Sequence, residues 1–278
     1  MRRVAGQRKR KRRKKRNATG AGVWALLLCA AVLVGVAWLM PKPQAVNETE
    51  PAPTVLTPNP YDADDFQYDG QYLTCLAGES VLGVDVSSHQ GVIDWQQVKD
   101  AGFEFAILRV GYRGYESGEI NLDTMAQRNY EGAKAAGLKV GAYFFSQAVN
   151  EAEALEEAEF LLDQIALWDV DMPVVFDWEY VNDTARTANM DKRSLTWCTQ
   201  AFAQRIQLAG YQPMLYFNPH LAQDFLELEQ LADYPFWLAL YTQEMTYPYQ
   251  VDMWQYTQDG TVPGINGNVD INLCLPYE

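Results

Sequence analysis

The sequence is poor in residues that commonly bind transition metals. It has two histidines, His89 and His220, and four cysteines among 278 residues. No two of them have the close Cys/His spacing by which zinc sites are recognised. The sequence therefore predicts no metal site, and we expect no cofactor.

Acidic residues are absent from the first 47 positions. Eleven of the 22 Lys and Arg residues lie between Arg2 and Arg16, whereas all 36 Asp and Glu residues lie at or after Glu48. From Asn17 onward, eleven basic residues therefore face 36 acidic ones, a net charge of -25. This segregation excludes a uniformly acidic soluble enzyme and a nucleic-acid binder with a basic folded domain. The hydrophobic content of 48% excludes disorder over most of the chain.

Charge is missing altogether from Ala21 to Met40, a run of twenty mostly apolar residues. At a helical rise of about 1.5 Å per residue, this run can cross the roughly 30 Å hydrocarbon layer of a membrane. Trp24 and Trp38 lie near its ends, where indole rings favour the interface. A cleaved signal peptide is the alternative, but its apolar region is only about 7–15 residues long and ends in small residues. We therefore expect an uncleaved transmembrane helix over residues 21–40.

The cations before this helix predict its orientation, because positively charged flanks stay in the cytoplasm. Residues 1–20 are expected to form a basic cytoplasmic tail, and residues 21–40 to anchor the chain in the lipid bilayer. The chain would then be a single-pass protein of the cell membrane, with everything after Met40 extracellular. The same cations could bind nucleic acid or anionic lipid headgroups, but topology accounts for them, and we expect no nucleic-acid partner.

Residues 41–70 are rich in proline and acids. Proline stiffens such a segment into an extended spacer, so we expect an extracellular linker with little regular structure. Residues 71–278 are expected to form one folded domain.

Within that domain, short β-rich runs alternate with helical patterns. Such alternation predicts a parallel sheet with right-handed crossovers, and eight strand candidates predict closure into a barrel. The last three strands are joined by segments too short for full helices, so we expect an α/β fold: a flattened, irregular TIM-like barrel of about eight strands with fewer helices. The expected strands begin at Val81, Phe105, Lys139, Pro173, Pro213, Phe236, Met253 and Val269, and the expected helices span residues 94–102, 123–137, 150–166 and 191–210.

The cysteines outside the apolar run would face an oxidising exterior. Cys75 precedes the first expected strand and Cys274 ends the last, and in a closed barrel these ends are neighbours. The sequence therefore predicts a Cys75–Cys274 disulfide, with Cys198 left as a buried thiol.

Acidic residues follow the ends of several expected strands, where an α/β barrel builds its active site. Asp177 and Glu179 alternate along one strand, so they point to the same side with Cα atoms about 6.5–7 Å apart. Two such carboxyls repel each other, which raises the pKa of one of them. One protonated acid beside one ionised acid is what cleavage of a glycosidic bond requires. A salt-bridged pair or a metal site is the alternative for this Asp-Trp-Glu triplet.

Several further motifs occur together with this triplet. They are GVDVSSHQGVIDW, FAILRVGY, GAYFFSQA, VVFDWEY, FWLALY, MWQYT and NVDINL, in this order from about Leu82 to the C-terminus. With them the chain resembles glycoside hydrolase family 25, the lysozymes that cleave peptidoglycan. The resemblance implies N-acetylmuramidase activity on the β-1,4 bond between N-acetylmuramic acid and N-acetylglucosamine. It also implies the flattened barrel inferred above and glycan strands of peptidoglycan as the partner.

The resemblance also implies roles for particular residues. Glu179 matches the general acid of the family and Asp177 its partner carboxylate, and Asp85 and Asp270 match the other acids of the cleft. Positions expected to shape the sugar subsite are Tyr143, Tyr216, Trp254, Gln255 and Asn272. One departure is Phe144, where many members have His, and this could alter a subsite contact. Among other residues, His89 is expected to form hydrogen bonds at the rim, and Arg109 could either pair with a site carboxylate or close a barrel layer.

Two features of the function stay open at the level of sequence. The 2-acetamido group of the muramic acid could act as an internal nucleophile assisted by Asp177, or a carboxylate could activate water with inversion. A chitinase-like hydrolase of acetamido sugars and a non-catalytic wall-binding domain are the rival functions. The sequence shows no separate wall-binding module, so the anchor would provide localisation, and we expect a monomer. This favours action on the wall of the producing cell over a secreted lytic function, and a role in surface machinery is equally compatible.

Overall fold

A computed structural model of the protein describes residues 55–275. The expected tail of residues 1–20 and the expected transmembrane helix of residues 21–40 lie outside this range. Within residues 55–275, no helix is long and apolar enough to cross a bilayer.

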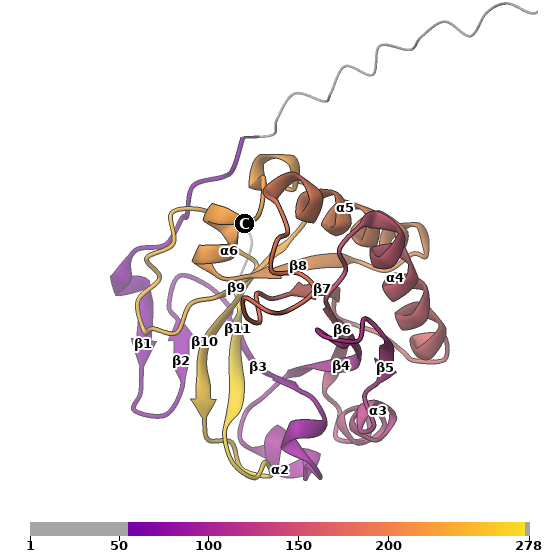
Figure 1. Cartoon of the computed structure of the whole chain (residues 1–278). Helices are drawn as coiled ribbons and strands as arrows, with labels where there is room; N and C mark the ends of the chain where they lie inside the picture. The colour runs from indigo at the N-terminus through magenta and orange to yellow at the C-terminus, as the bar shows by residue number, and fades with distance from the viewer. Residues whose placement is uncertain (1–54, 276–278) are drawn as a thin grey trace, which may run out of the picture. The chain divides into compact units, whose positions relative to one another are not determined.

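Eight strands close into a barrel (Figure 1). In pairing order they are β3 (Val81–Val86), β4 (Phe105–Arg113), β6 (Lys139–Ser146), β7 (Val174–Trp178), β8 (Pro213–Phe217), β9 (Phe236–Ala239), β10 (Met253–Gly260) and β11 (Val269–Cys274), which returns to β3. A short strand, β5 (Ile120–Leu122), pairs with the end of β4. All eight predicted strands are therefore present, and the predicted irregular barrel is confirmed.

The last strand differs from the expected parallel arrangement. The pairs from β3 through β10 are parallel, but β11 is antiparallel to both β10 and β3. Only residues 261–268 connect β10 to β11. A parallel crossover needs about a dozen residues or more, so this connection can only form a hairpin. The start of β11 therefore lies at the end of the barrel where the other strands finish.

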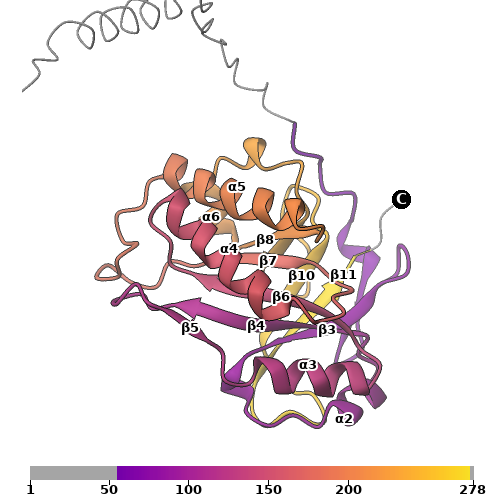
Figure 2. The same cartoon turned by 90° about the vertical axis from the view of Figure 1, so that its right-hand side faces the viewer.

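Four helices cover the first half of the barrel, as predicted (Figure 2). Asn150 and Asp191 cap the N-termini of the third and fourth, each accepting a hydrogen bond from a backbone N–H. A fifth, α6, is short, and no helix lies between β9, β10 and β11. The helices are α2 (Trp95–Asp100), α3 (Ala126–Ala135), α4 (Glu151–Ile165), α5 (Lys192–Leu208) and α6 (Pro219–Asp224).

A small hairpin takes the place of a helix beside β10 (Figure 1). It consists of β1 (Phe66–Tyr68) and β2 (Leu73–Cys75), which form a separate two-stranded sheet. The Phe66 ring meets Trp254 of β10 edge to face, with centroids 5.2 Å apart. Before the hairpin, Leu56 is buried and Pro58 forms a β-bridge with Tyr249. The expectation of an irregular linker up to residue 70 is thus wrong for its last part, because these residues bury apolar surface against the barrel.

The apolar side chains form two clusters, because neighbouring residues of a strand point to opposite faces. The smaller cluster fills the barrel interior, and the larger lies between barrel and helices. Cys75 belongs to the outer cluster, whereas Cys274 packs against the inner one. The predicted Cys75–Cys274 disulfide is therefore wrong, and both are free thiols, as is the buried Cys198. Inner cluster members are Phe105, Ile107, Tyr143, Val175, Met214, Trp237 and Met253.

Candidate active site

The four predicted acids meet at one end of the barrel, around a pocket of about 250 Å³. Asp85 lies near the end of β3, Asp177 near the end of β7, and Glu179 just beyond β7. Asp270 reaches the same place from the start of β11, and it is paired directly with Asp85. The reversal of β11 therefore brings the fourth acid into the site.

Most of the predicted subsite residues lie in or just below this pocket. Tyr143, Tyr216 and Gln255 line it, and Asn272 contacts Asp85 from the adjacent strand. Trp254 does not line it: its indole is fully buried in the outer cluster and donates a hydrogen bond to the Leu240 carbonyl. The placement of Trp254 in the sugar subsite is therefore a mistaken prediction.

The departure at Phe144 does not touch the site. Its ring is buried on the outer face of β6, with the Phe160 ring of α4 6.0 Å away. A change of residue type here affects packing between barrel and helix, and the expectation of an altered subsite contact is not supported.

Asp85 is held by two side-chain amides. Gln255 Nε2 and Asn272 Nδ2 each donate a hydrogen bond of 2.8 Å to its Oδ2 atom. The amide oxygens are occupied as well, since Gln255 Oε1 accepts from Tyr216 and Tyr241, and Asn272 Oδ1 accepts from the indole of Trp237. These bonds fix the amides with their NH₂ groups toward Asp85. Burial raises the pKa of Asp85 to about 6, and the two amide bonds counteract this rise.

Glu179 lies in a different environment. Its carboxyl receives no hydrogen bond from residues 55–275, and burial raises its pKa to about 7, with the Asp85 charge as the second cause. Burial also raises the pKa of Asp270 to about 8, again reinforced by Asp85. At neutral pH, negative charge is therefore favoured on Asp85, and Glu179 retains a substantial protonated fraction.

Asp177 is the most enclosed of the four acids, with 5% of its surface exposed. Its Oδ1 atom has no hydrogen-bond partner within the described part of the chain. Burial raises its pKa well above the ordinary value, and repulsion from Glu179 and Asp85 adds to this. A buried oxygen without a partner is costly, so this atom is suited to accept a hydrogen bond from a ligand.

Arg109 and His89 both lie at the rim of the pocket. Arg109 lines the pocket but pairs with Asp123, at 2.8 Å, and with the Ser88 hydroxyl rather than with any of the four acids. His89 is exposed at the edge of the pocket, where its backbone N–H donates to Ser87.

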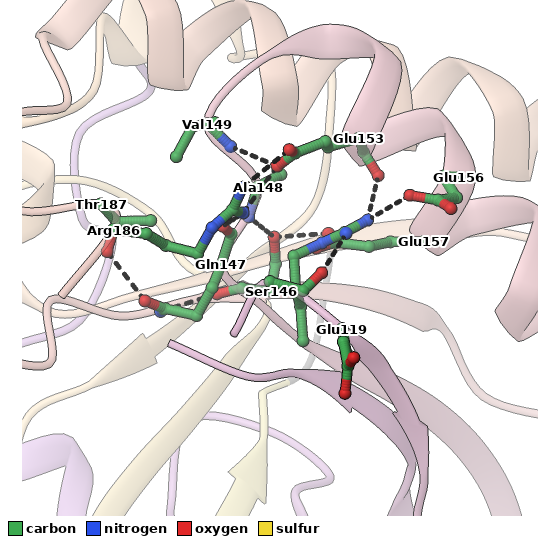
Figure 3. A network of polar contacts seen from close by, with 12 residues as sticks. Glu119, Ser146, Gln147, Ala148, Val149, Glu153, Glu156, Glu157, Arg186 and Thr187 are labelled. Atoms are coloured by element: carbon green, nitrogen blue, oxygen red, sulfur yellow. Dashed lines mark hydrogen bonds and ion pairs between the residues drawn. The ribbon is translucent and has the colours of Figure 1, made fainter. Parts of the chain in front are cut away.

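Gln147, which the sequence analysis did not single out, holds the segment that carries Glu179. Its Nε2 donates to the Glu179 carbonyl at 2.8 Å, and its Oε1 accepts from the Thr187 hydroxyl at 2.8 Å. Arg186 donates to the Gln147 carbonyl and forms an ion pair of 2.6 Å with Glu153 of α4 (Figure 3). The segment after β7 is thus fixed to β6 and α4.

Tyr241 is a second residue that the sequence analysis missed. It follows the end of β9, lines the pocket and donates a hydrogen bond to Gln255. Both Tyr241 and Gln147 are polar residues just after a strand, so the rule that selected the acids would also have selected them.

The chain is similar to several known proteins. The profile of glycosyl hydrolases family 25 matches residues 84–265. An uncharacterized protein of Escherichia coli (strain K12), YegX, is 29% identical over 262 residues, which cover 89% of this chain and 88% of YegX. Lysozyme M1 of Streptomyces globisporus is 28% identical over 203 residues, with 69% and 67% covered.

Solved structures are similar as well. The modular autolysin LytC from Streptococcus pneumoniae has a TM-score of 0.63 at 25% identity over 75% of this chain. The match covers 51% of LytC, so this chain spans about half of that autolysin, which has also been solved in complex with a synthetic peptidoglycan ligand. A lysozyme from Streptomyces coelicolor has a TM-score of 0.57 at 25% identity, covering 70% of this chain and 91% of that one.

Proposed function

The chain belongs to glycosyl hydrolases family 25 and is a glycoside hydrolase, and from this premise we propose its substrate, catalytic residues and location. It is an N-acetylmuramidase that cleaves the β-1,4 bond between N-acetylmuramic acid and N-acetylglucosamine in peptidoglycan. It is anchored in the cell membrane through residues 21–40 and acts outside the cell.

The contrast between Asp85 and Glu179 carries the catalytic part of the proposal. Asp85 receives two amide hydrogen bonds that favour its charged form, whereas Glu179 is half-buried and its carboxyl receives no such bond from residues 55–275. Two carboxyls whose environments separate their pKa values in this way can serve as one ionised group and one proton donor. Glu179 therefore protonates the leaving oxygen while positive charge develops at the anomeric carbon, and Asp85 stabilises that charge.

Asp177 positions the substrate's own nucleophile, the 2-acetamido group. Its Oδ1 atom, which has no hydrogen-bond partner among residues 55–275, accepts the N–H of the 2-acetamido group, so that the acetamido oxygen can attack the anomeric carbon from the face opposite the leaving group. Water then opens the resulting ring with net retention. Direct attack by water would give inversion, so NMR of the first anomer formed distinguishes the two routes.

Digestion of purified peptidoglycan tests the proposed substrate. A muramidase leaves muramic acid at the new reducing ends, so borohydride reduction after digestion converts muramic acid, not glucosamine, to its alcohol. Chitin oligomers are assayed in parallel, and faster cleavage of chitin would favour a chitinase-like enzyme. Binding to the wall without any cleavage would favour a non-catalytic wall-binding domain.

The rate is expected to depend on pH with two limbs. Glu179 must be protonated, so kcat/KM falls about tenfold per unit as pH rises beyond about 7. Asp85 must be ionised, so kcat/KM also falls as pH drops below about 6. A pH–rate profile between pH 4 and 9 checks this, and a rate that keeps rising above pH 8 would contradict the role of Glu179.

Removal of residues 1–40 tests the location. The part of the chain from Asn17 carries a net charge of -25, so it is not attracted to an anionic cell wall, and the anchor has to keep it near its substrate. The shortened protein is expected to be soluble and active on free peptidoglycan, while the full chain sediments with membranes. A shortened protein that still sediments with membranes would contradict the anchor.

A further inference from the structure

A second hollow lies next to the catalytic pocket and has a volume of about 510 Å³. We call it the hairpin pocket, because the turn of the β1–β2 hairpin forms one wall with Tyr68, Gly70 and Gln71. The segment after β9 and the second half of β10 form the other walls. Tyr241 and Gln258 line both this hollow and the catalytic pocket, so the two are contiguous.

The hairpin wall is a fixed part of the domain. The Leu73 N–H donates to the Tyr256 hydroxyl of β10, and the Tyr72 hydroxyl donates to the Thr261 carbonyl at 3.3 Å. The Tyr72 ring also meets Phe103 edge to face, with centroids 5.1 Å apart. Figure 1 shows the hairpin beside β10, and it precedes the residues 84–265 that match the family profile. The hairpin pocket is therefore built partly from residues outside the matched region.

The lining of the hairpin pocket suits a neutral sugar. Two tyrosine side chains are freely accessible, Tyr68 at 41% and Tyr241 at 49% exposure, and the Tyr241 hydroxyl is fixed by its bond to Gln255. Aromatic rings of this kind offer apolar faces with a polar edge. Side-chain amides that can bind hydroxyl and acetamido groups come from three glutamines, Gln71, Gln243 and Gln258.

Charge argues against an acidic peptide as the ligand. The lining contains no Lys, Arg or His, and its one ionisable acid is Asp259. The free carboxylates of a peptide would meet no cation here and would be repelled by Asp259, whereas an N-acetylated sugar brings no formal charge.

We propose that the hairpin pocket binds an N-acetylated sugar of the same glycan strand, beyond the two sugars that flank the cleaved bond. The assignment rests on the proposed function, because the strand must pass through the catalytic pocket to reach it. The hairpin pocket then makes the enzyme prefer long strands over short fragments.

The experiment compares two peptide-free substrates: long glycan strands stripped of stem peptides with an amidase, and the disaccharide of N-acetylmuramic acid β-1,4-linked to N-acetylglucosamine, which carries only the two sugars that flank the cleaved bond. Tyr68→Ala is expected to lower kcat/KM on the long strands about five- to tenfold, through KM, and to leave cleavage of the disaccharide unchanged. Gln243→Ala, in the wall formed by the segment after β9, is expected to act in the same direction. The matched control is Trp197→Ala, since Trp197 is 45% exposed on α5 and lines neither pocket. It should change neither substrate.

Equal activity of Tyr68→Ala, Gln243→Ala and the parent chain on long strands would overturn the proposal. So would a loss seen only on strands that still carry stem peptides, which would assign the hollow to peptide. If the parent chain cleaves neither substrate, the proposed function fails instead. Titration calorimetry then measures the affinity of long strands for Glu179→Gln and for the double variant Glu179→Gln/Tyr68→Ala. This comparison tests the hairpin pocket independently of turnover, and equal affinities would reject the proposal.

Discussion

Glu179→Gln is expected to abolish peptidoglycan cleavage almost completely, with a loss of kcat of about 10³-fold or more. General acid catalysis by a positioned side chain contributes about 10²–10⁴-fold, and glutamine has the shape of the acid but no proton to give. KM should change little, because substrate contacts remain. Release of reducing ends from purified peptidoglycan measures the loss, and a variant that keeps more than a tenth of the parent rate would contradict the assignment.

The same substitution provides its own control for folding, because it is expected to stabilise the protein at neutral pH. The pKa of Glu179 rises from 4.5 to about 7 on folding, so the native state binds more protons than the unfolded state between these values. The free energy of unfolding therefore falls as pH rises through this window. Glutamine avoids this cost, and Tm should exceed that of the parent by several degrees at pH 8, corresponding to about 1–3 kcal/mol.

Near pH 4 the two melting temperatures should converge, because Glu179 is then protonated in both the folded and the unfolded state. Thermal unfolding followed by circular dichroism at pH 4 and pH 8 makes the comparison. A lower Tm for Glu179→Gln at pH 8 would mean that the carboxylate stabilises the fold instead.

Asp177→Asn is expected to lower kcat about 10²–10³-fold, with KM nearly unchanged. The ground state hardly distinguishes the two side chains, because a carboxyl oxygen of Asp177 and the amide oxygen of asparagine can both accept the acetamido N–H. The difference arises in the transition state, where the acetamido group gains positive charge and asparagine offers no compensating negative charge.

Comparison of two substrates makes this test specific. A glycan whose acetamido groups are replaced by free amines cannot provide the internal nucleophile. On such a glycan, Asp177→Asn should cost much less than on the natural one. An Asn variant within tenfold of the parent on natural peptidoglycan would show that Asp177 does not act as a charged group.

The barrel could be predicted from sequence because each of its strands is a separate apolar run followed by a polar residue. The same feature located the acids, because the carboxyl ends of the parallel strands meet at one end of the barrel. The direction of β11 was not predicted, although the connection of residues 261–268 is too short for a crossover. The β1–β2 hairpin escaped detection because strands of three residues are too short to display a period.

Errors about single residues had equally physical causes. Trp254 and Gln255 are neighbours on β10, and neighbours on a strand face opposite sides, so the two could not both reach the pocket. The amide bonds to Asp85 come from Gln255 and Asn272, which are 170 and 187 residues away along the chain. Such contacts depend on strand register, which the pattern of a single strand does not contain.

The reversed last strand has a consequence for how the domain can be extended. Cys274, at the end of β11, pairs with Val81 at the start of β3, which lies at the barrel end remote from the acids. The chain therefore leaves the barrel on the side opposite to where a glycan enters. A tag, reporter or additional module appended after β11 would therefore not obstruct the binding of a glycan. Fusion at the C-terminus is accordingly the arrangement of choice for imaging or immobilising the enzyme in an active form.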